Sequence, residues 1–145
     1  MHFKDFRVGQ VIHSPPTRIE QPEIIAFAKA NDPQWFHTDP ERAAAGRWHG
    51  IIASGWHTCA IAMRLAYECI LNDSDSIGSP GIAYLKWPVP VRPGDELRLE
   101  VSILETRISS SGLFGVVRWR WRLLNQTDET VLDLETTSLF DLTQN

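Results

Sequence analysis

The sequence predicts an α+β fold in which one long antiparallel sheet covers a buried helix. Segment 56–72 is apolar around almost its whole circumference, which is typical of a helix buried on nearly all sides. After Gly81 the chain alternates apolar and polar residues in short runs separated by turns, as half-buried antiparallel strands do. Because helices come first and strands follow, a parallel α/β sheet is not expected.

The part of the chain before the buried helix predicts one strand and two helices. Residues 6–13 have the pattern of a bent edge strand, which two prolines then end. A helix is expected over 21–30, with a proline in its first turn and its end just before an Asp-Pro step. Asp39 and Pro40 predict the cap and the first residue of a second, short helix.

Four strands are expected after the buried helix, over 81–91, 96–105, 116–124 and 131–140. The first contains two prolines, so it lies at a sheet edge or is irregular. The third alternates tryptophans with arginines, and the fourth carries acidic residues at the same spacing. Cross-strand ion pairs explain both stripes better than nucleic-acid binding does, and phosphate binding by one arginine stays open. The arginines are Arg118, Arg120 and Arg122.

The composition is that of a single globular domain, expected to span 1–145. The chain has 145 residues, of which 43% are hydrophobic, and this is enough for a sizeable core. A formal charge of −4 and a pI near 5.7 argue against nucleic acid or an anionic membrane as the main partner. No apolar run reaches transmembrane length, and the N-terminus lacks the pattern of a signal peptide. We therefore expect a cytoplasmic protein.

The two cysteines agree with a reducing compartment. Cys59 and Cys69 fall in the same predicted helix, where ten residues rise about 15 Å, which is too far for a disulfide within the chain. Neither has a second cysteine at metal-ligand spacing. Both are expected to act as small hydrophobic residues.

Asp32 and His37 are the first candidates for chemistry. They lie five residues apart, and Pro33 prevents a continuous helix between them, so a loop can bring both side chains to one point. A carboxylate and an imidazole that converge on a water form a general acid/base pair. Trp35 and Phe36 could wall this site and make the carboxylate more basic. The alternative is an aspartate in a turn and a packed histidine, and spacing alone favours that alternative.

Ser54 and Gly55 directly precede the buried helix. Free N–H groups at a helix N-terminus bind anions or polarised carbonyls, and a glycine lets a ligand approach the backbone closely. This is the arrangement of an oxyanion hole for a thioester carbonyl. The alternative is an N-capping serine followed by a glycine that packing requires.

The remaining histidines give weak signals. His57 lies in the first turn of the buried helix and His49 in a loop, where a histidine is more often structural than catalytic. A metal site built from His37, Asp39, His49 and His57 matches no trusted ligand spacing, so no metal is expected. The serine in segment 52–56 also lacks the preceding glycine of a nucleophile elbow.

Segments 27–46, FAKANDPQWFHTDPERAAAG, and 51–65, IIASGWHTCAIAMRL, together resemble the MaoC-like dehydratases, which include the (R)-specific enoyl-CoA hydratases. The shared pattern is an aspartate, a histidine five residues later, a short helix, and a glycine at the start of the central helix. Segment 91–97, VRPGDEL, is also similar to a turn of this family. The resemblance covers nearly the whole chain, from Val8 to Phe140.

The resemblance implies a hot-dog fold, a homodimer, and a lyase that reversibly adds water to trans-2-enoyl thioesters. Asp32 and His37 would activate the water, and the Gly55 N–H would hold the thioester oxygen. Coenzyme A would enter near the subunit interface as part of an acyl-CoA substrate, and no other cofactor is implied. Trp35, Phe36, Ser54, Trp56 and His57 are the candidates for the substrate pocket.

The sequence departs from the family pattern at three places. The family's Asn-Pro before the histidine is replaced by residues 33–36, PQWF, and the family often has histidine where Ser54 stands. A serine that positions the aspartate in family members falls on Ala60, which leaves Thr58 and His57 as candidate partners of Asp32. Two other functions stay open on the same fold: a hot-dog thioesterase, and a non-catalytic subunit that binds acyl thioesters.

Overall fold

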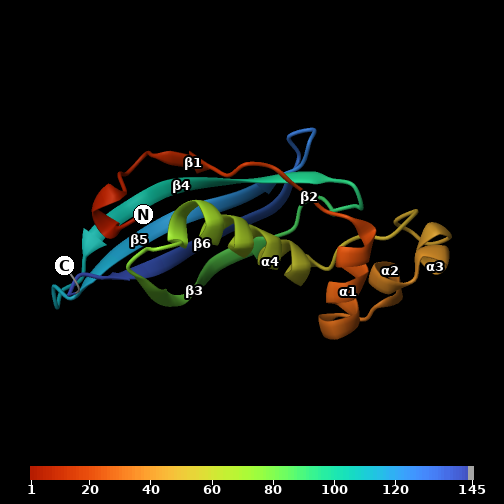
Figure 1. Ribbon diagram of the computed structural model, residues 1–145, viewed down its shortest axis with the longest axis horizontal. Helices are drawn as coiled ribbons and strands as arrows, with labels where there is room; N and C mark the ends of the chain where they lie inside the picture. Colours follow the sequence, from red (N-terminus) through yellow and green to blue (C-terminus); the bar gives the residue numbers. More distant parts are fainter. Residues whose placement is uncertain (144–145) are drawn as a thin grey trace.

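The structure, a computed structural model, describes residues 1–143 and is built on one antiparallel sheet (Figure 1). Its strands are β1 (Val11–His13), β2 (Thr17–Arg18), β3 (Ser76–Lys86), β4 (Glu96–Ile108), β5 (Phe114–Leu124) and β6 (Thr130–Asp141). They pair in the order β1-β4-β5-β6-β3, and β2 pairs with β4. The three consecutive strands β4, β5 and β6 follow the expected ranges.

The helices are η1 (Phe3–Asp5), α1 (Gln21–Asn31), α2 (Trp35–Thr38), α3 (Pro40–Ala44) and α4 (Gly55–Ala66), which continues as the π-helical turn η2 (Tyr67–Leu71). The short helix η1 lies at the opposite end of the sheet from α1, α2 and α3 (Figure 1). In Figure 1, α4 runs along the sheet, whereas α1, α2 and α3 cluster beyond its N-terminal end. No helix in residues 1–143 has the length and apolar character needed to cross a membrane.

The core fills the space between α4 and the sheet. Ile61, Ala62, Leu65 and Ala66 of α4 face inward, and the alternating apolar residues of β4, β5 and β6 meet them. The largest side chains in this layer are fully buried: Trp119, Phe140, Leu97, Leu99, Ile103, Leu123 and Leu132. One long sheet wrapped around one helix is the hot-dog arrangement, so the α+β prediction is confirmed.

The expectation that the central helix is buried on all sides is wrong for the single chain. Trp56 is 60% exposed and Met63 is 46% exposed, on the side of α4 away from Ile61 and Leu65. One sheet can cover only one side of a helix. The remaining apolar side of α4 needs a different cover, or it borders a ligand site.

Smaller differences concern the termini of elements. Only Val11–His13 of the expected strand 6–13 pairs with β4, because the chain turns at Gly9, where φ is 87°. The predicted cap is confirmed, since the Asp39 carboxylate accepts the Arg42 N–H at 3.0 Å. β3 lies at the sheet edge as expected, but it begins at Ser76 and ends before both prolines.

The arginine stripe forms ion pairs across the sheet, as the sequence predicted. Arg120 donates twice to Asp133, at 3.0 and 2.8 Å. Arg118 donates to Glu135 at 2.8 Å, and Arg122 donates to Glu100. Because acidic partners hold these guanidinium groups, the stripe is not a free basic surface.

Candidate active site

Two consecutive helix ends bring Asp32 and His37 together. Asp32 ends α1, where its N–H donates to Ala28 at 2.8 Å, and Pro33 prevents the helix from continuing. The chain restarts at once as α2, a single helical turn that carries His37. The Phe36 carbonyl then accepts the Ile52 N–H at 3.1 Å, which ties α2 to the segment that leads into α4.

His37 is held so that one ring nitrogen faces Asp32. Its Nδ1 lies 2.7 Å from the Ile52 carbonyl oxygen, and a carbonyl can only accept, so Nδ1 carries a proton. The Nε2 atom lies 3.3 Å from Asp32 Oδ2. In the neutral ring Nε2 is therefore the nitrogen with a free lone pair. The His37 side chain is 6% exposed and Asp32 is 18% exposed, so the pair sits just below the surface.

The Asp32 carboxylate has two further donors. Ser54 Oγ donates to Oδ2 at 2.7 Å, and Gln34 Nε2 donates to Oδ1 at 2.8 Å. Burial raises the pKa of Asp32, but the bonds from Ser54 and Gln34 and the nearby His37 outweigh it, and the pKa falls below its usual value. The expectation of a more basic carboxylate is wrong, because donors to the charged form surround it.

Neither Thr58 nor His57, the two residues expected to hydrogen-bond to Asp32, does so. Thr58 Oγ1 donates to the Ser54 carbonyl at 3.3 Å, and His57 points toward α1. Ser54 takes the role instead. It stands directly before α4 and is fully buried, so its hydroxyl lies within reach of the Asp32 carboxylate across the gap between the two helices.

Gly55 shares a cavity of about 250 Å³ with His37. As the first residue of α4, it has a backbone N–H without an acceptor inside the helix. The indole of Trp87 packs directly on Gly55: a Cβ added there would lie 2.5 Å from Trp87 Cε2. Thr58 and Trp48 complete this end of the cavity. The contact with Trp87 therefore accounts for a glycine at this position. The free N–H at the N-terminus of α4 is a second reason.

The aromatic residues of α2 serve packing more than the cavity. Trp35 lies under Arg42, whose Cζ is 4.5 Å from the ring centroid, and its ring fills the space beside Gly46. Phe36 meets the His37 ring edge-on at 4.3 Å. Neither lines the cavity that His37 and Gly55 share.

Trp56 and His57 point in different directions from the first turn of α4. Trp56 meets Trp87 edge-on at 5.3 Å and is exposed. His57 stacks on Phe27 at 4.6 Å, and its Nε2 lies 3.6 Å from Glu23. Burial lowers the pKa of His57, and its Nδ1 has no hydrogen-bond partner among residues 1–143. His57 therefore lies between α1 and α4, apart from the Asp32–His37 pair.

Gln34 and Trp87 are the site residues that sequence reasoning missed. Gln34 belongs to the segment 33–36 that departs from the family pattern, and its side chain reaches back two residues to Asp32. A glutamine two residues after an aspartate is a local pattern from which this hydrogen bond could have been predicted. Trp87 has no such signal, because 32 residues separate it from Gly55. Within residues 1–143, no group of three His, Cys, Asp or Glu side chains could hold a metal ion.

The family model of the MaoC-like domain matches residues 5–117, which include every residue of the site described above. This chain is a MaoC-like dehydratase family member. YdeM, an uncharacterised protein of Bacillus subtilis, is 33% identical over 93% of this chain and 95% of its own length. The 3-hydroxyacyl-thioester dehydratase Z of Mycobacterium tuberculosis is 36% identical over 68% of this chain and 64% of that protein.

A solved MaoC-like dehydratase from Rhodospirillum rubrum has the same fold as this family member. The two superpose with a TM-score of 0.87 at 38% identity, over 95% of this chain and 94% of that chain. The resemblance noted in the sequence is thus confirmed at the level of family and fold.

The Ser54–Asp32 hydrogen bond gives a prediction for pH dependence. Ser54→Ala removes a donor to the ionised carboxylate, so we expect the Asp32 pKa to rise and the acidic limb of the kcat/KM profile to move to higher pH. A lowered folded-state pKa stabilises the protein above the unfolded value, and the stabilisation is lost as pH falls through the folded value. Ser54→Ala should therefore lower the free energy of unfolding at pH values above the unfolded pKa of Asp32, and its difference from the wild type should shrink as pH falls through the folded pKa.

The measurement is a pH–rate profile together with unfolding at several pH values. Ser111→Ala, which changes a serine in an exposed turn, is the matched control. An acidic limb that stays in place in Ser54→Ala would show that Asp32 does not control it.

Proposed function

We propose that the protein is a hydratase that adds water across the trans-2 double bond of an enoyl-CoA, and a 3-hydroxyacyl-CoA dehydratase in reverse. One observation carries the proposal: His37, which pairs with the Asp32 carboxylate, lines a cavity that Gly55, the first residue of the central helix, lines as well. The name of the relative dehydratase Z, a 3-hydroxyacyl-thioester dehydratase, supports the same reaction class.

The acid/base pair supplies the two proton transfers. A water between Asp32 and His37 loses a proton to His37 Nε2, whose lone pair is free because Nδ1 is bonded to Ile52. The water oxygen bonds to Cβ of the enoyl group as the double-bond electrons move toward the carbonyl. His37 then returns that proton to Cα on the same face. Asp32 stays ionised throughout, orients the water and stabilises the imidazolium.

The N-terminus of α4 supports the enolate that forms between these two transfers. When water adds to Cβ, negative charge develops on the thioester oxygen. The Gly55 N–H, at the positive end of a twelve-residue helix, would donate to that oxygen. A fixed donor of this kind stabilises the enolate more than it stabilises the neutral substrate, and so it lowers the barrier.

The experiment is an assay of the purified protein with crotonyl-CoA and longer enoyl-CoAs. Loss of the enoyl absorbance without release of CoA thiol supports hydration. Thiol release without hydration would indicate a thioesterase, and tight binding without turnover would indicate a binding subunit; either outcome overturns the proposal.

The working form proposed for this enzyme is a homodimer that pairs through β3. Within residues 1–143, β3 has a strand on one side only, β6, so its other backbone edge is free to pair. Ile77 and Ile82 on β3 are 51% and 54% exposed, and Tyr67 beyond α4 is 52% exposed. Two copies related by a two-fold axis would cover these residues with each other.

A charge at this edge should weaken the dimer. We expect a native mass of twice 16.5 kDa for the wild type and a shift toward monomer in Ile82→Lys, measured by analytical ultracentrifugation. Ile108→Lys, at a residue 61% exposed near the end of β4, is the control and should leave the mass unchanged. A wild-type protein that stays monomeric at micromolar concentration contradicts the pairing.

The proposed location is a reducing compartment such as the cytoplasm. Cys59 and Cys69 are both unpaired, and burial raises the pKa of each thiol, which keeps them protonated and unreactive.

A further inference from the structure

A second contact joins the two helices whose ends form the candidate site. Asp32 ends α1 and Ser54 directly precedes α4, so the 2.7 Å hydrogen bond between them lies where the two helices meet. Three residues further along the chain, His57 of α4 stacks on Phe27 of α1, with ring centroids 4.6 Å apart and ring planes 12° from parallel. The two helices are thus joined at two places, and one of these places holds the Asp32 carboxylate.

A charged side chain of α1 adds to the stack. Glu23 lies four residues before Phe27, on the same face of α1. Its Oε1 lies 3.6 Å from His57 Nε2 and accepts a hydrogen bond from Arg64 Nη1 at 3.1 Å. Arg64 is seven residues after His57, so both lie on one face of α4. One carboxylate of α1 therefore lies between two side chains of α4, and this arrangement opposes sliding of the helices past each other.

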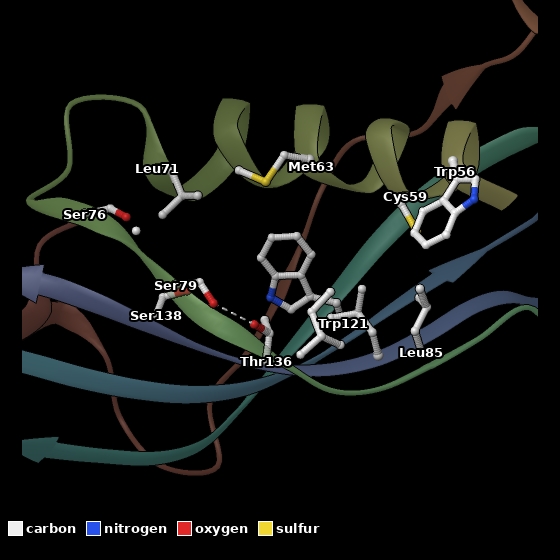
Figure 2. A pocket seen from close by; sticks show the side chains of 13 residues that line it. Trp56, Cys59, Met63, Leu71, Ser76, Ser79, Leu85, Trp121, Thr136 and Ser138 are labelled. Atoms are coloured by element: carbon white, nitrogen blue, oxygen red, sulfur yellow. Dashed lines mark hydrogen bonds between the residues drawn. The ribbon is translucent and has the colours of Figure 1, made fainter. Parts of the chain in front are cut away.

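His57 lies on a different face of α4 from the residues that border the sheet. Trp56, Cys59 and Met63 line a cavity of about 420 Å³, which β3, β5 and β6 also line (Figure 2). His57 lines a separate cleft of about 310 Å³, whose other wall is the Glu23 face of α1. A substitution at His57 therefore changes the contact with α1 and leaves the lining of the cavity beside the sheet unchanged.

Packing alone does not explain a histidine at position 57. The side chain is 5% exposed, and its Nδ1 has no hydrogen-bond partner within residues 1–143. A buried polar atom without a partner lowers stability. A phenylalanine would stack on Phe27 without that cost. What the histidine adds is Nε2, which faces Glu23 and so gives the contact between the helices a direction.

A small tilt of α1 would be transmitted to the site. Asp32 lies five residues after Phe27, a rise of about 7.5 Å along a helix, and a helix is rigid over that length. A tilt about the stack therefore changes the distances from the Asp32 carboxylate to Ser54 and to His37. A misplacement of about 1 Å can slow a reaction ~10²-fold.

We infer that His57 is a positioning residue for the hydration reaction: together with Glu23 it fixes the angle between α1 and α4 and thereby holds the Asp32 carboxylate against Ser54. It acts through the two helices and not on the substrate. The inference rests on the proposed function for the reaction that Asp32 serves. The position of the carboxylate, however, can be measured without any substrate.

The first test uses His57→Phe, which keeps the stack and removes both ring nitrogens. The free energy of unfolding should stay equal or rise, because the unpaired Nδ1 is gone. The kcat for crotonyl-CoA should fall ~10-fold with KM changed less than ~2-fold, since a displaced carboxylate slows the proton transfers rather than binding. His13→Phe, at an exposed position in β1, is the matched control and should leave kcat and stability unchanged.

The second test needs no substrate and uses Glu23→Leu, which removes the acceptor shared by two side chains of α4. The lost negative charge by itself would lower the pKa of Asp32. If α1 is released, the bond from Ser54 weakens and the pKa of Asp32 rises instead, because His37, its ionisable neighbour, is unchanged. Carbon NMR of the Asp32 carboxyl group measures this pKa. Glu41→Leu removes a carboxylate from the first turn of α3 and should not raise it.

The outcomes separate this inference from the proposed function. An Asp32 pKa that falls or stays in Glu23→Leu, or a His57→Phe variant that keeps its kcat or loses stability along with it, overturns the positioning role. Hydration by the wild type together with such a result leaves the hydratase assignment standing. An Asp32 pKa that rises in a protein that hydrates no enoyl-CoA supports the positioning of the carboxylate and overturns the hydratase.

Discussion

Asp32→Asn and His37→Ala should each lower kcat/KM for enoyl-CoA hydration by at least ~10²-fold, the scale of one general acid/base group. The Asp32→Asn substitution keeps the shape of the carboxylate but loses the charge that would stabilise the His37 imidazolium. The His37→Ala substitution removes the nitrogen that lies 3.3 Å from Asp32 and would carry the proton. Because the two groups act on one water, kcat/KM of the double variant should be only slightly lower than that of either single variant.

Controls must show that these variants still fold. His37 bonds to the Ile52 carbonyl, so His37→Ala leaves a buried acceptor unpaired and should also lower the melting temperature. Asp32→Asn keeps two groups that can bond to Ser54 and Gln34, and it is the cleaner probe. Asp73→Asn and His13→Ala, both at exposed positions, are the matched controls. Full activity in Asp32→Asn and His37→Ala would remove the pair from the mechanism.

The sequence was sufficient for the fold where local chemistry decides the structure. Alternating residues predicted β4, β5 and β6, and the Asp39-Pro40 step predicted the start of α3. The burial of α4 could not be predicted from its pattern. Its apolar circumference combines two surfaces, one packed against the sheet and one that the single chain leaves exposed at Trp56 and Met63, and a sequence pattern does not distinguish them.

The proximity of Asp32 and His37 could be predicted from the sequence, but the groups that hydrogen-bond to them could not. Asp32 and His37 lie five residues apart, and this short spacing suggests them as a pair. Ser54 lies 22 residues from Asp32, and no local rule predicts that contact. The direction of the Asp32 pKa depends on the donors Ser54 and Gln34, not on the aromatic neighbours that the sequence suggested. Long-range packing therefore determines the electrostatics.

Gly55 has two explanations, and the contact with Trp87 allows them to be separated. A glycine here either lets a ligand approach the backbone or makes room for the indole of Trp87. The added carbon of Gly55→Ala would lie 2.5–2.8 Å from three indole carbons, which no side chain tolerates without a shift. The direction of that Cβ is toward Trp87, so we expect the cost to come from the displaced ring.

Gly55→Ala should therefore lower the free energy of unfolding by ~1–3 kcal/mol, the usual cost of overpacking, and should lower kcat/KM as the first turn of α4 shifts. In a Trp87→Ala background the new methyl group enters the space that the indole leaves, and the same substitution should cost almost nothing in either measurement. Chemical denaturation and kinetics on the wild type, both single variants and the double variant complete the cycle. An equal loss of kcat/KM in both backgrounds would show that Gly55 is needed for the ligand itself. A cost that disappears with Trp87 would leave the N–H as the contribution of this residue to the reaction, since alanine keeps the N–H, and would make Trp87 the reason for the glycine.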